Sequence, residues 1–469
     1  MKVKTRFAPS PTGFIHLGNA RTALHSFLYA KSRNGHFLLR MEDTDIERSD
    51  NNLADALQVD LKWLGINWEE GVGIKGEHAP YYQAERLPIY EKFYQILVEK
   101  RLAYPCFCTE EQLALSRKLQ RARGMAPRYA GTCYSLSKEE VQKKVDQGLK
   151  PALRFHAPNG THIVFDDVVK GRQQFNVDDM GDFIIRRSNL MPSFMFCNAI
   201  DDSLMEVTHA IRGEDHLTNT PRQVMILQAL NLRVPQYGHI SLILGMDGAP
   251  LSKRNGSRSI RDLQEIGYLP LAIVNHLARL GHYYENNALM TLKELSEQFK
   301  AHMLSKSPAR YDEAQLTHWQ KLAIEQLDDE AFWQWAGSDI KKNMPEDKQV
   351  LFVKTIKPNV LFPQDVHYWA DLFFAAHYEM PADKLDFITA AGKVYYKEAQ
   401  EVAKKTGINA KLFFNDLKGA LNVNGKALYM PVRLALTGSE HGPEMEAIFQ
   451  LLGEEKVIER FKKAYEVCS

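Results

Sequence analysis

The chain has 469 residues, 45% of them hydrophobic and 25% charged, a composition that is typical of a globular protein and excludes a disordered or fibrous one. Because 59 Lys and Arg balance 58 Asp and Glu to a net charge of +1, a nucleic-acid partner has to be bound through local basic patches. The first residues lack the apolar core of a signal peptide, no apolar run reaches about 18 residues, and five cysteines are too few for a disulfide framework. We therefore expect a cytoplasmic protein of about three domains with no membrane-spanning segment.

The chain begins with a predicted strand, turn and helix. The strand covers residues 3–7 and must end at the two prolines of 9–11, since proline cannot donate to a sheet. The helix has apolar residues at helical spacing over 24–31 and a left-handed stop at 34–35. Such a unit places the start of a helix beside the carboxyl edge of a sheet, where open α/β folds bind nucleotides. The turn has no glycine-rich phosphate-binding motif, so the phosphates require a second segment.

The next segments continue the α/β pattern. A buried strand over 36–41 ends in the carboxylates of 42–45, and a leucine-rich helix over 53–64 stops at Gly65. Residues 112–138 then hold six basic side chains and no acidic one: Arg117, Lys118, Arg121, Arg123, Arg128 and Lys138. This basic run is either a solvated helix face or a surface that contacts phosphates.

The middle of the chain is predicted to hold a small α+β insertion and then more of the sheet. Strands are expected at 163–165, 183–185, 194–200, 205–211 and 239–244. Thr220 as N-cap and Pro221 at the first helical position predict a helix between the last two. After Ile260 helical spacing dominates without a convincing strand, and an all-α region is expected from about residue 316.

Two segments together suggest a chemistry. His16 lies at the start of the first helix, and a loop over 245–256 carries Lys253 directly after a strand. Nucleotidyl transfer builds negative charge on phosphate oxygens, so its catalysis depends on positioning and charge neutralisation. His16 and Lys253 suit that task, and Gly18 allows a nucleotide to approach the backbone closely. Either motif alone is more often structural, whereas both at strand ends favour a nucleotide site.

These motifs resemble those of class I aminoacyl-tRNA synthetases, and in detail those of bacterial glutamyl-tRNA synthetases. The similar segments are 5–13 with 16–19, 40–45, 211–216, 251–254 and 431–438, which extend over nearly the whole chain. The resemblance implies a Rossmann-type parallel-sheet catalytic domain with an α+β insertion, followed by an all-α anticodon-binding region. The implied bounds are 1–90 and 195–250 for the catalytic domain, 91–194 for an insertion that binds the tRNA acceptor end, 251–315 for a stem-contact region and 316–469 for the anticodon-binding domain.

The resemblance also implies an activity. It is the ATP-dependent ligation of L-glutamate to tRNA(Glu) through a glutamyl-adenylate, with ATP used together with Mg²⁺ and with AMP and pyrophosphate released. Members of the family need bound tRNA for the activation step and are usually monomers. We therefore expect a monomer whose partners are tRNA(Glu), glutamate and ATP. The sequence leaves open whether tRNA(Gln) is also charged.

Site roles follow position by position from the same resemblance. His16 and Lys253 are the implied catalytic residues, and the implied ATP contacts are His16, Gly18, Asn19, Ser252, Lys253 and Arg254. The implied glutamate contacts are Arg6, Ala8, Ser10, Glu42, Phe194, Asn198 and Arg212. Among them, Arg6 would pair with the substrate's side-chain carboxylate and Glu42 with its ammonium group. An internal ion pair with Glu42 or Asp43 is the alternative for Arg40 and Arg212.

Three positions depart from the family pattern. Phe194 stands where many relatives have Tyr, which removes one hydroxyl contact to the substrate. Pro250 replaces a Lys before the second ATP motif, and Asn255 replaces a His. The missing Lys removes one charge near the phosphates. We expect weaker ATP binding with the chemistry retained through Lys253.

A possible metal site lies in the insertion. Cys106, Cys108 and Cys133 resemble a zinc knuckle of some bacterial relatives, but tetrahedral zinc needs four ligands. Tyr129 lies four residues before Cys133, as in a related knuckle that uses Tyr as a ligand. Structural zinc and three reduced structural cysteines both remain open.

Two other functions are compatible with this core. One is a tRNA-modifying glutamate ligase, which attaches glutamate to a modified base and lacks the anticodon-binding half that is present here. The other is a nonenzymatic RNA-binding paralogue, which the intact Arg6, His16, Glu42 and Lys253 argue against.

Overall fold

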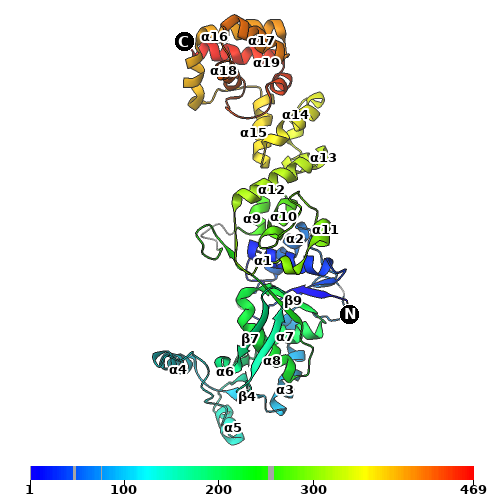
Figure 1. Cartoon of the computed structure of the whole chain (residues 1–469), viewed down its shortest axis with the longest axis vertical. Helices are drawn as coiled ribbons and strands as arrows, with labels where there is room; N and C mark the ends of the chain where they lie inside the picture. The colour runs from blue at the N-terminus through cyan, green and yellow to red at the C-terminus, as the bar shows by residue number, and fades with distance from the viewer. Residues whose placement is uncertain (1, 46–48, 75, 252–257, 469) are drawn as a thin grey trace. The chain divides into compact units, whose positions relative to one another are not determined.

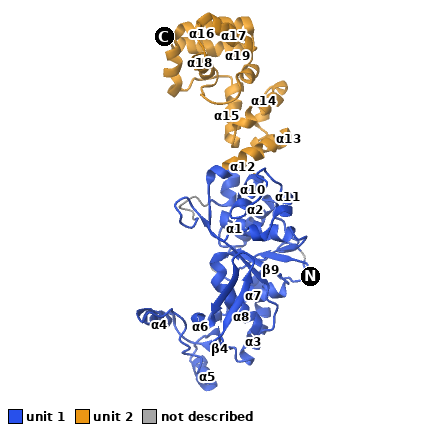
Figure 2. Cartoon of the chain, viewed as in Figure 1, with its two compact units in different colours: residues 1–265, 270–316 blue, residues 266–269, 317–469 orange. Residues whose placement is uncertain are grey.

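The computed structural model describes residues 2–45, 49–74, 76–251 and 258–468 (Figure 1). They divide into two compact units, residues 1–265 with 270–316 and residues 266–269 with 317–469 (Figure 2). None of the described helices combines the length and the apolar character that crossing a membrane requires.

A five-stranded parallel sheet is the centre of the first unit. Its order is β10 (Gln236–Ile240), β9 (His209–Gly213), β1 (Lys4–Phe7), β2 (His36–Leu39) and β3 (Glu70–Gly71). The helices that connect neighbouring strands are α1 (Leu17–Lys31), α2 (Asn51–Trp63) and α8 (Thr220–Ala229). Because β1 has β2 on one side and β9 on the other, its carboxyl end is the topological switch point at which such sheets bind ligands. The predicted Rossmann-type sheet is confirmed.

The insertion lies between β3 and β9 and mixes helices with two small sheets. Its elements are η1 (Gln83–Arg86), α3 (Leu87–Glu99), β4 (Ala103–Cys106), α4 (Glu110–Ala122), α5 (Lys138–Asp146), β5 (Ala152–Phe155), β6 (His162–Asp167), β7 (Gly171–Asn176), α6 (Val177–Met180) and β8 (Phe183–Arg186). Strands β4, β5 and β8 form an antiparallel sheet, and β6 and β7 form a hairpin. Helix α4 extends away from these sheets and buries none of its residues (Figure 1). All six side chains of the basic run are exposed.

The prediction of a strand over 194–200 was wrong. This segment belongs to helix α7 (Phe194–Leu204). A short apolar run cannot be assigned to strand or helix by its length alone, and here burial on two faces decides. Phe196, Cys197 and Ile200 pack into the apolar core, while Asn198 and Asp202, four residues apart, share another buried face. The polar face of α7 is therefore turned into the protein.

Further elements differ from the sequence prediction. The strand expected over 205–211 begins only at His209, as β9. The helix for which Thr220 was the expected N-cap has Thr220 as its first residue and Asn219 as its N-cap. The strand expected over 239–244 is divided into β10 and β11 (Ile243–Leu244). Between them, the amide of Leu242 donates a hydrogen bond to the side chain of Glu214 and not to a neighbouring strand. A short strand, β12 (Ala309–Arg310), follows Ile260 and pairs with β11. The remaining elements of this part are η2 (Glu214–Asn219), α9 (Ile260–Ile266), α10 (Pro270–Arg279), α11 (Leu292–Gln298) and η4 (Ala301–Met303).

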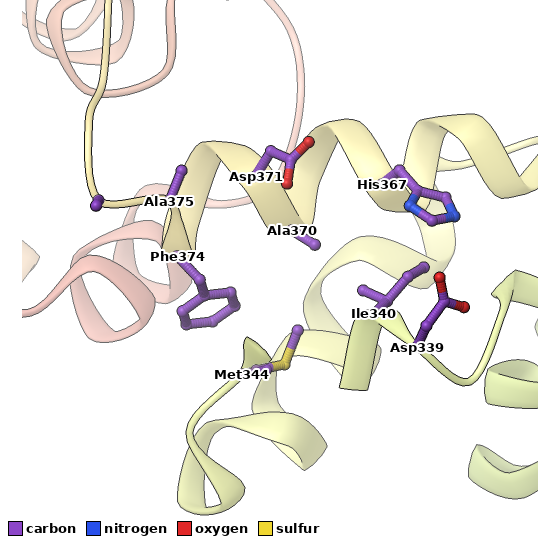
Figure 3. A pocket seen from close by; sticks show the side chains of 9 residues that line it. Asp339, Ile340, Met344, His367, Ala370, Asp371, Phe374 and Ala375 are labelled. Carbon is purple, nitrogen blue, oxygen red and sulfur yellow. The ribbon is translucent and has the colours of Figure 1, made fainter. Parts of the chain in front are cut away.

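The second unit is helical, as predicted, and has its own apolar core. Its elements are α12 (Glu313–Gln326), α13 (Asp329–Ala336), η5 (Ile340–Asn343), η6 (Glu346–Lys348), α14 (Gln349–Ile356), η7 (Lys357–Asn359), α15 (Pro363–Phe374), η8 (Ala382–Lys384), α16 (Leu385–Thr406), α17 (Ala410–Leu421), α18 (Lys426–Thr437) and α19 (Met445–Val467). A cavity of about 380 Å³ lies between α15 and the segment 339–344 (Figure 3). Its lining residues all belong to the second unit, whereas His16 belongs to the first.

Candidate active site

The turn between β1 and α1 presents His16 at the helix start. His16 is the N-cap of α1, and its Nδ1 accepts a hydrogen bond from the amide of Gly18 at 3.1 Å. A Cβ atom on Gly18 would lie 3.0 Å from Cε1 of the same imidazole, so a larger residue would displace the ring. His16 and Asn19, another predicted ATP contact, are both exposed. The turn is therefore open to a ligand from solvent.

The residues on either side of the second predicted ATP motif contact β11 and this turn. Residue 251 lies beside β11, where its amide donates to the carbonyl of Ile243 at 2.9 Å. On the other side of the loop, Ser259 forms a bridge with His16, and Ile260 donates to Ile15 at 2.9 Å. Three predicted ATP-binding residues lie outside the described residues: Ser252, Lys253 and Arg254. The neighbouring contacts bring the chain after this motif next to the first motif.

A buried ion-pair cluster lies at the carboxyl ends of β1 and β2. The guanidinium of Arg6 donates from Nε and Nη2 to the two oxygens of Asp202, each at 3.1 Å. Arg40 donates from Nη2 to the same carboxylate at 2.9 Å. Burial opposes ionisation of Asp202, but the two arginines outweigh it and keep its pKa below the ordinary value. Asp202 is thus the anion that holds both arginines in place.

Asn198 connects this cluster to Glu42. Its Oδ1 accepts from Nη2 of Arg6 at 3.4 Å and from Nη2 of Arg40 at 3.3 Å, and its Nδ2 donates to Glu42. Arg40 also lies 3.9 Å from the Glu42 carboxylate, so the alternative of an internal ion pair, which the sequence left open, applies to Arg40, with Asp202 and Asp201 nearer than Glu42. Burial raises the pKa of Glu42 to about 7, although Arg40 and Arg6 act to lower it. A ligand cation would therefore stabilise the ionised form of Glu42.

Arg212 differs from the other two arginines because its partners are uncharged. Its Nη2 donates to Thr220 Oγ1 at 2.8 Å and to Gln223 Oε1 at 2.6 Å, and its Nε donates to His239 Nε2 at 3.2 Å. The side chain is buried, and Nη1 has no hydrogen-bond partner in the described structure. Burial lowers the pKa of Arg212 to about 10.

No carboxylate of the described residues lies within 4.0 Å of the Arg212 guanidinium. The internal ion pair of Arg212 with Glu42 or Asp43, which the sequence left open, is therefore not formed. A buried guanidinium with an unused donor favours a carboxylate or phosphate as ligand, because an unpaired buried charge is costly.

The other predicted glutamate contacts surround this cluster less directly. Ala8 is half-buried, Ser10 is exposed on the turn, and Phe194 stacks on the ring of His216 with centroids 5.1 Å apart. Among the described residues, side-chain hydrogen bonds join Arg6, Glu42 and Asn198, whereas the side chains of Ala8, Ser10 and Phe194 form none with them. The roles of these three positions remain predictions.

Sequence reasoning missed the two aspartates of α7. Asp202 binds Arg6 and Arg40, and Asp201 accepts from Arg86 at 2.7 Å and from Tyr90 at 2.6 Å. Both follow an apolar run that was interpreted as a strand. A helical assignment would have placed Asp202 four residues from Asn198 on one face, which is the signal that could have found it.

The three cysteines and the tyrosine of the insertion lie together. The sulfur atoms of Cys106, Cys108 and Cys133 are within 4.8 Å of one another, and the hydroxyl of Tyr129 lies 3.5 Å from Sγ of Cys106 and of Cys108. Ligands of a tetrahedral zinc ion are separated by about 3.8 Å between sulfurs, and Cys108 and Cys133 lie 3.6 Å apart. Arg154 donates to Cys106 at 3.1 Å, which favours a thiolate there. The three sulfur atoms therefore lie close enough to share a metal ion, and the hydroxyl of Tyr129 lies beside them.

Comparison with known proteins identifies the family. Residues 2–318 match the family model described as "tRNA synthetases class I (E and Q), catalytic domain". The chain belongs to these class I tRNA synthetases. A second model, "Anticodon binding domain", matches residues 330–465 of this synthetase.

Individual relatives agree with this family. The synthetase is 53% identical over 462 residues to glutamate–tRNA ligase 1 of Coxiella burnetii, covering 98% of this chain and 99% of the relative. It is 47% identical to glutamate–tRNA ligase 2 of Nitrosococcus oceani, covering 98% of both. A solved structure of a glutamate tRNA ligase from Elizabethkingia meningosepticum, in complex with its amino acid, is similar at a TM-score of 0.89 and 29% identity over 100% of both chains.

Proposed function

We propose that this synthetase ligates L-glutamate to tRNA(Glu) through a glutamyl-adenylate, using ATP as its Mg²⁺ complex. The observation that carries the proposal is Arg212, a buried guanidinium with an unused donor and no internal carboxylate partner. It belongs to a site that also holds Glu42, a buried carboxylate with a pKa of about 7. A ligand that brings both a carboxylate and an ammonium group meets both demands, and an amino acid has that chemistry.

The recognition of glutamate follows from these groups. Arg212 and Asn198 contact substrate carboxylates, Glu42 holds the α-ammonium, and Ala8 and Ser10 form the floor of the pocket. Arg6 can add only its one remaining N–H group, on Nη1, toward the side-chain carboxylate that Arg212 also contacts, because Asp202, Asn198 and the carbonyl of Ile211 accept from its other four. Glutamine is rejected because an amide in place of the side-chain carboxylate leaves the buried guanidinium of Arg212 without its counter-charge, whereas Arg6 keeps Asp202.

The chemistry consists of two transfers. The α-carboxylate of glutamate attacks the α-phosphorus of ATP, a carboxyl oxygen–phosphorus bond forms, and pyrophosphate leaves. A hydroxyl of the terminal tRNA ribose then attacks the carbonyl carbon, an ester forms, and AMP leaves. His16 lies at the helix start next to the phosphates and stabilises their developing charge, together with the predicted contribution of Lys253.

The insertion and the helical unit provide the contacts to tRNA. The six exposed basic side chains of 112–138 support an acceptor-end surface, since phosphates attract such a cluster. The match of residues 330–465 to an anticodon-binding model supports recognition of the anticodon by the second unit. We expect a monomer to suffice for both contacts.

Glutamate binding should depend on pH through Glu42. Its raised pKa means that the carboxyl is protonated as the pH falls through about 7, and the protonated form cannot hold an ammonium group. We expect the KM for glutamate to rise about tenfold between about pH 8 and about pH 6, while the KM for ATP changes little. Steady-state kinetics of wild type and Glu42→Gln test this expectation. A flat glutamate profile in wild type, or the same slope in Glu42→Gln, would contradict it.

We also propose structural zinc on Cys106, Cys108, Cys133 and Tyr129. Protein purified without chelator should contain about one zinc ion per chain. Tyr129→Phe keeps the ring that packs 3.8 Å from the Arg154 guanidinium but removes the ligand oxygen, so it should lose zinc to a chelator faster than wild type. Zinc content near zero would refute the metal site, and equal rates of loss would remove Tyr129 from the ligand set.

One experiment separates the proposed reaction from its alternatives. Radiolabelled glutamate on the terminal ribose is released with the 3′-terminal adenosine when ribonuclease A cleaves the tRNA, whereas glutamate on a modified base stays with an internal fragment. We expect label on tRNA(Glu), visible as a shift in an acid gel, and recovery of that label with the terminal adenosine. Label in an internal fragment would indicate the tRNA-modifying ligase, and no label would indicate the nonenzymatic paralogue. Purified tRNA(Gln) in the same assay shows whether it is charged as well.

A further inference from the structure

The turn between β6 and β7 brings a carboxylate of the insertion to the central sheet. Asp167, the last residue of β6, is buried, and its Oδ1 accepts from the amides of Val169 at 2.9 Å and Lys170 at 2.8 Å. The same oxygen accepts a hydrogen bond from the backbone amide of His239 in β10 at 3.2 Å. Lys170 adds an ion pair with Glu214, which follows β9. The turn is therefore fixed against the strands that carry the candidate active site.

The second oxygen of Asp167 determines which nitrogen of His239 carries the proton. Oδ2 lies 2.5 Å from His239 Nδ1, a separation that requires a proton between the two atoms. Burial lowers the pKa of His239 below its ordinary value, although Asp167 acts to raise it. The neutral ring therefore has its proton on Nδ1 and a lone pair on Nε2.

That lone pair faces Arg212. His239 Nε2 accepts from Nε of Arg212 at 3.2 Å and lies 3.0 Å from the hydroxyl of Thr220, which accepts from Nη2 of the same arginine. If the proton moved to Nε2, two donors would face each other and Arg212 would lose one of its three anchors. The tautomer of His239 thus affects where the guanidinium points.

We propose that Asp167 and His239 are positioning residues for Arg212, so that a carboxylate of the insertion orients the arginine that binds a glutamate carboxylate. This inference rests on the proposed function, because it assigns the carboxylate contact to Arg212. Neither residue touches the substrate: Asp167 fixes the imidazole tautomer, and His239 fixes the edge of the guanidinium. The unused Nη1 of Arg212 is then held toward the ligand without an internal carboxylate to compete for it.

Asp167→Asn is a nearly isosteric change that tests the hydrogen-bond relay from Asp167 through His239 to Arg212. The Asn oxygen still accepts the three backbone amides, but its NH₂ group donates to Nδ1 and drives the proton of His239 to Nε2. We expect the KM for glutamate to rise about 10- to 100-fold, while the KM for ATP changes less than about twofold. Asp182→Asn is the matched control, because Asp182 pairs with His156 in the insertion at 3.3 Å and neither residue contacts Arg212 in the described structure. A wild-type KM for glutamate in Asp167→Asn, or an equal effect in Asp182→Asn, would overturn the proposal.

The His239→Gln background separates a tautomer effect from structural damage. A Gln side chain can present its oxygen at the position of Nε2. It can therefore accept a hydrogen bond from Arg212 with either Asp or Asn at position 167. Adding Asp167→Asn to His239→Gln should therefore leave the KM for glutamate unchanged within about twofold. An additional loss as large as in the wild-type background would show that Asp167 acts on the fold alone and would refute the relay.

A spectroscopic measurement keeps this inference distinct from the proposed reaction. In ¹⁵N-histidine-labelled protein, with His239→Gln used for assignment, His239 should be protonated at Nδ1 in wild type and at Nε2 in Asp167→Asn. An unchanged tautomer would refute the relay even in an active enzyme. The expected tautomer change in an enzyme that does not respond to glutamate would contradict the proposed function and leave the hydrogen-bond relay intact.

Discussion

Replacing Arg212 with glutamine is expected to reduce kcat/KM for glutamate by two to four orders of magnitude. The physical reason is that Arg212 is buried and has only uncharged hydrogen-bond partners, so under the proposed function a substrate carboxylate is the anion that pairs with it directly. Removing one member of a buried, hydrogen-bonded ion pair costs about 3–5 kcal/mol, and about 1.4 kcal/mol corresponds to a factor of ten. The measurement is tRNA-dependent exchange of labelled pyrophosphate into ATP at varied glutamate concentration.

A nearby arginine provides the control for this change. Arg222 in α8 donates to the carbonyl of Thr218 at 2.7 Å and packs against Phe183, so Arg222→Gln removes the same charge outside the site. We expect its kcat/KM for glutamate to stay within about threefold of wild type. Similar losses in both variants, or normal glutamate kinetics in Arg212→Gln, would remove Arg212 from the substrate site.

Replacing Asp202 with asparagine is expected to lower the free energy of unfolding of the first unit by about 3–5 kcal/mol. Asp202 is the carboxylate that both Arg6 and Arg40 contact within hydrogen-bond distance, at 3.1 and 2.9 Å. An amide leaves these two buried guanidinium groups without their shared anion. The expected shift of the midpoint is roughly 6–10 °C, measured by calorimetry or circular dichroism of the full chain.

The lowered pKa of Asp202 determines in which direction its contribution to stability changes with pH. The pKa of Asp202 is lowered in the folded protein, so its contribution to stability is present above the ordinary pKa of Asp, about 3.9, and is lost as the pH falls through the folded value. Asp60→Asn is the control. Its carboxylate is also buried, but neither oxygen has a hydrogen-bond partner in the described structure, Arg261 lies 3.8 Å away, and burial raises its pKa. We expect Asp60→Asn to change stability by less than about 1 kcal/mol, and equal losses in the two variants would contradict the special role of Asp202.

The sheet and the turn before α1 were predictable because local signals specify them. The prolines at 9–11 end β1, His16 caps α1, and the left-handed backbone of Asn34, with φ of 52°, ends the following turn as expected. Gly65, with φ of 78°, likewise follows α2. These signals act over a few residues, so they can be read from the sequence without the tertiary structure.

The ionic cluster was not predictable in the same way, since its members come from distant parts of the chain. Arg6 and Asp202 are 196 residues apart, and their contact depends on α7 being a helix rather than the predicted strand. The relay from Asp167 to Arg212 also depends on how the insertion packs against β10. Motif resemblance selected Arg6, Glu42, Asn198 and Arg212, but it did not show which arginine lacks an internal carboxylate partner.

The most direct test of the central claim is exchange of labelled pyrophosphate into ATP by the wild-type chain, with tRNA(Glu) present and either glutamate or glutamine as substrate. We predict exchange with glutamate, and a kcat/KM for glutamine lower by about four orders of magnitude, because the amide leaves Arg212 without a counter-charge. Absence of exchange with glutamate, or equal exchange with both amino acids, would contradict the claim that this site activates glutamate.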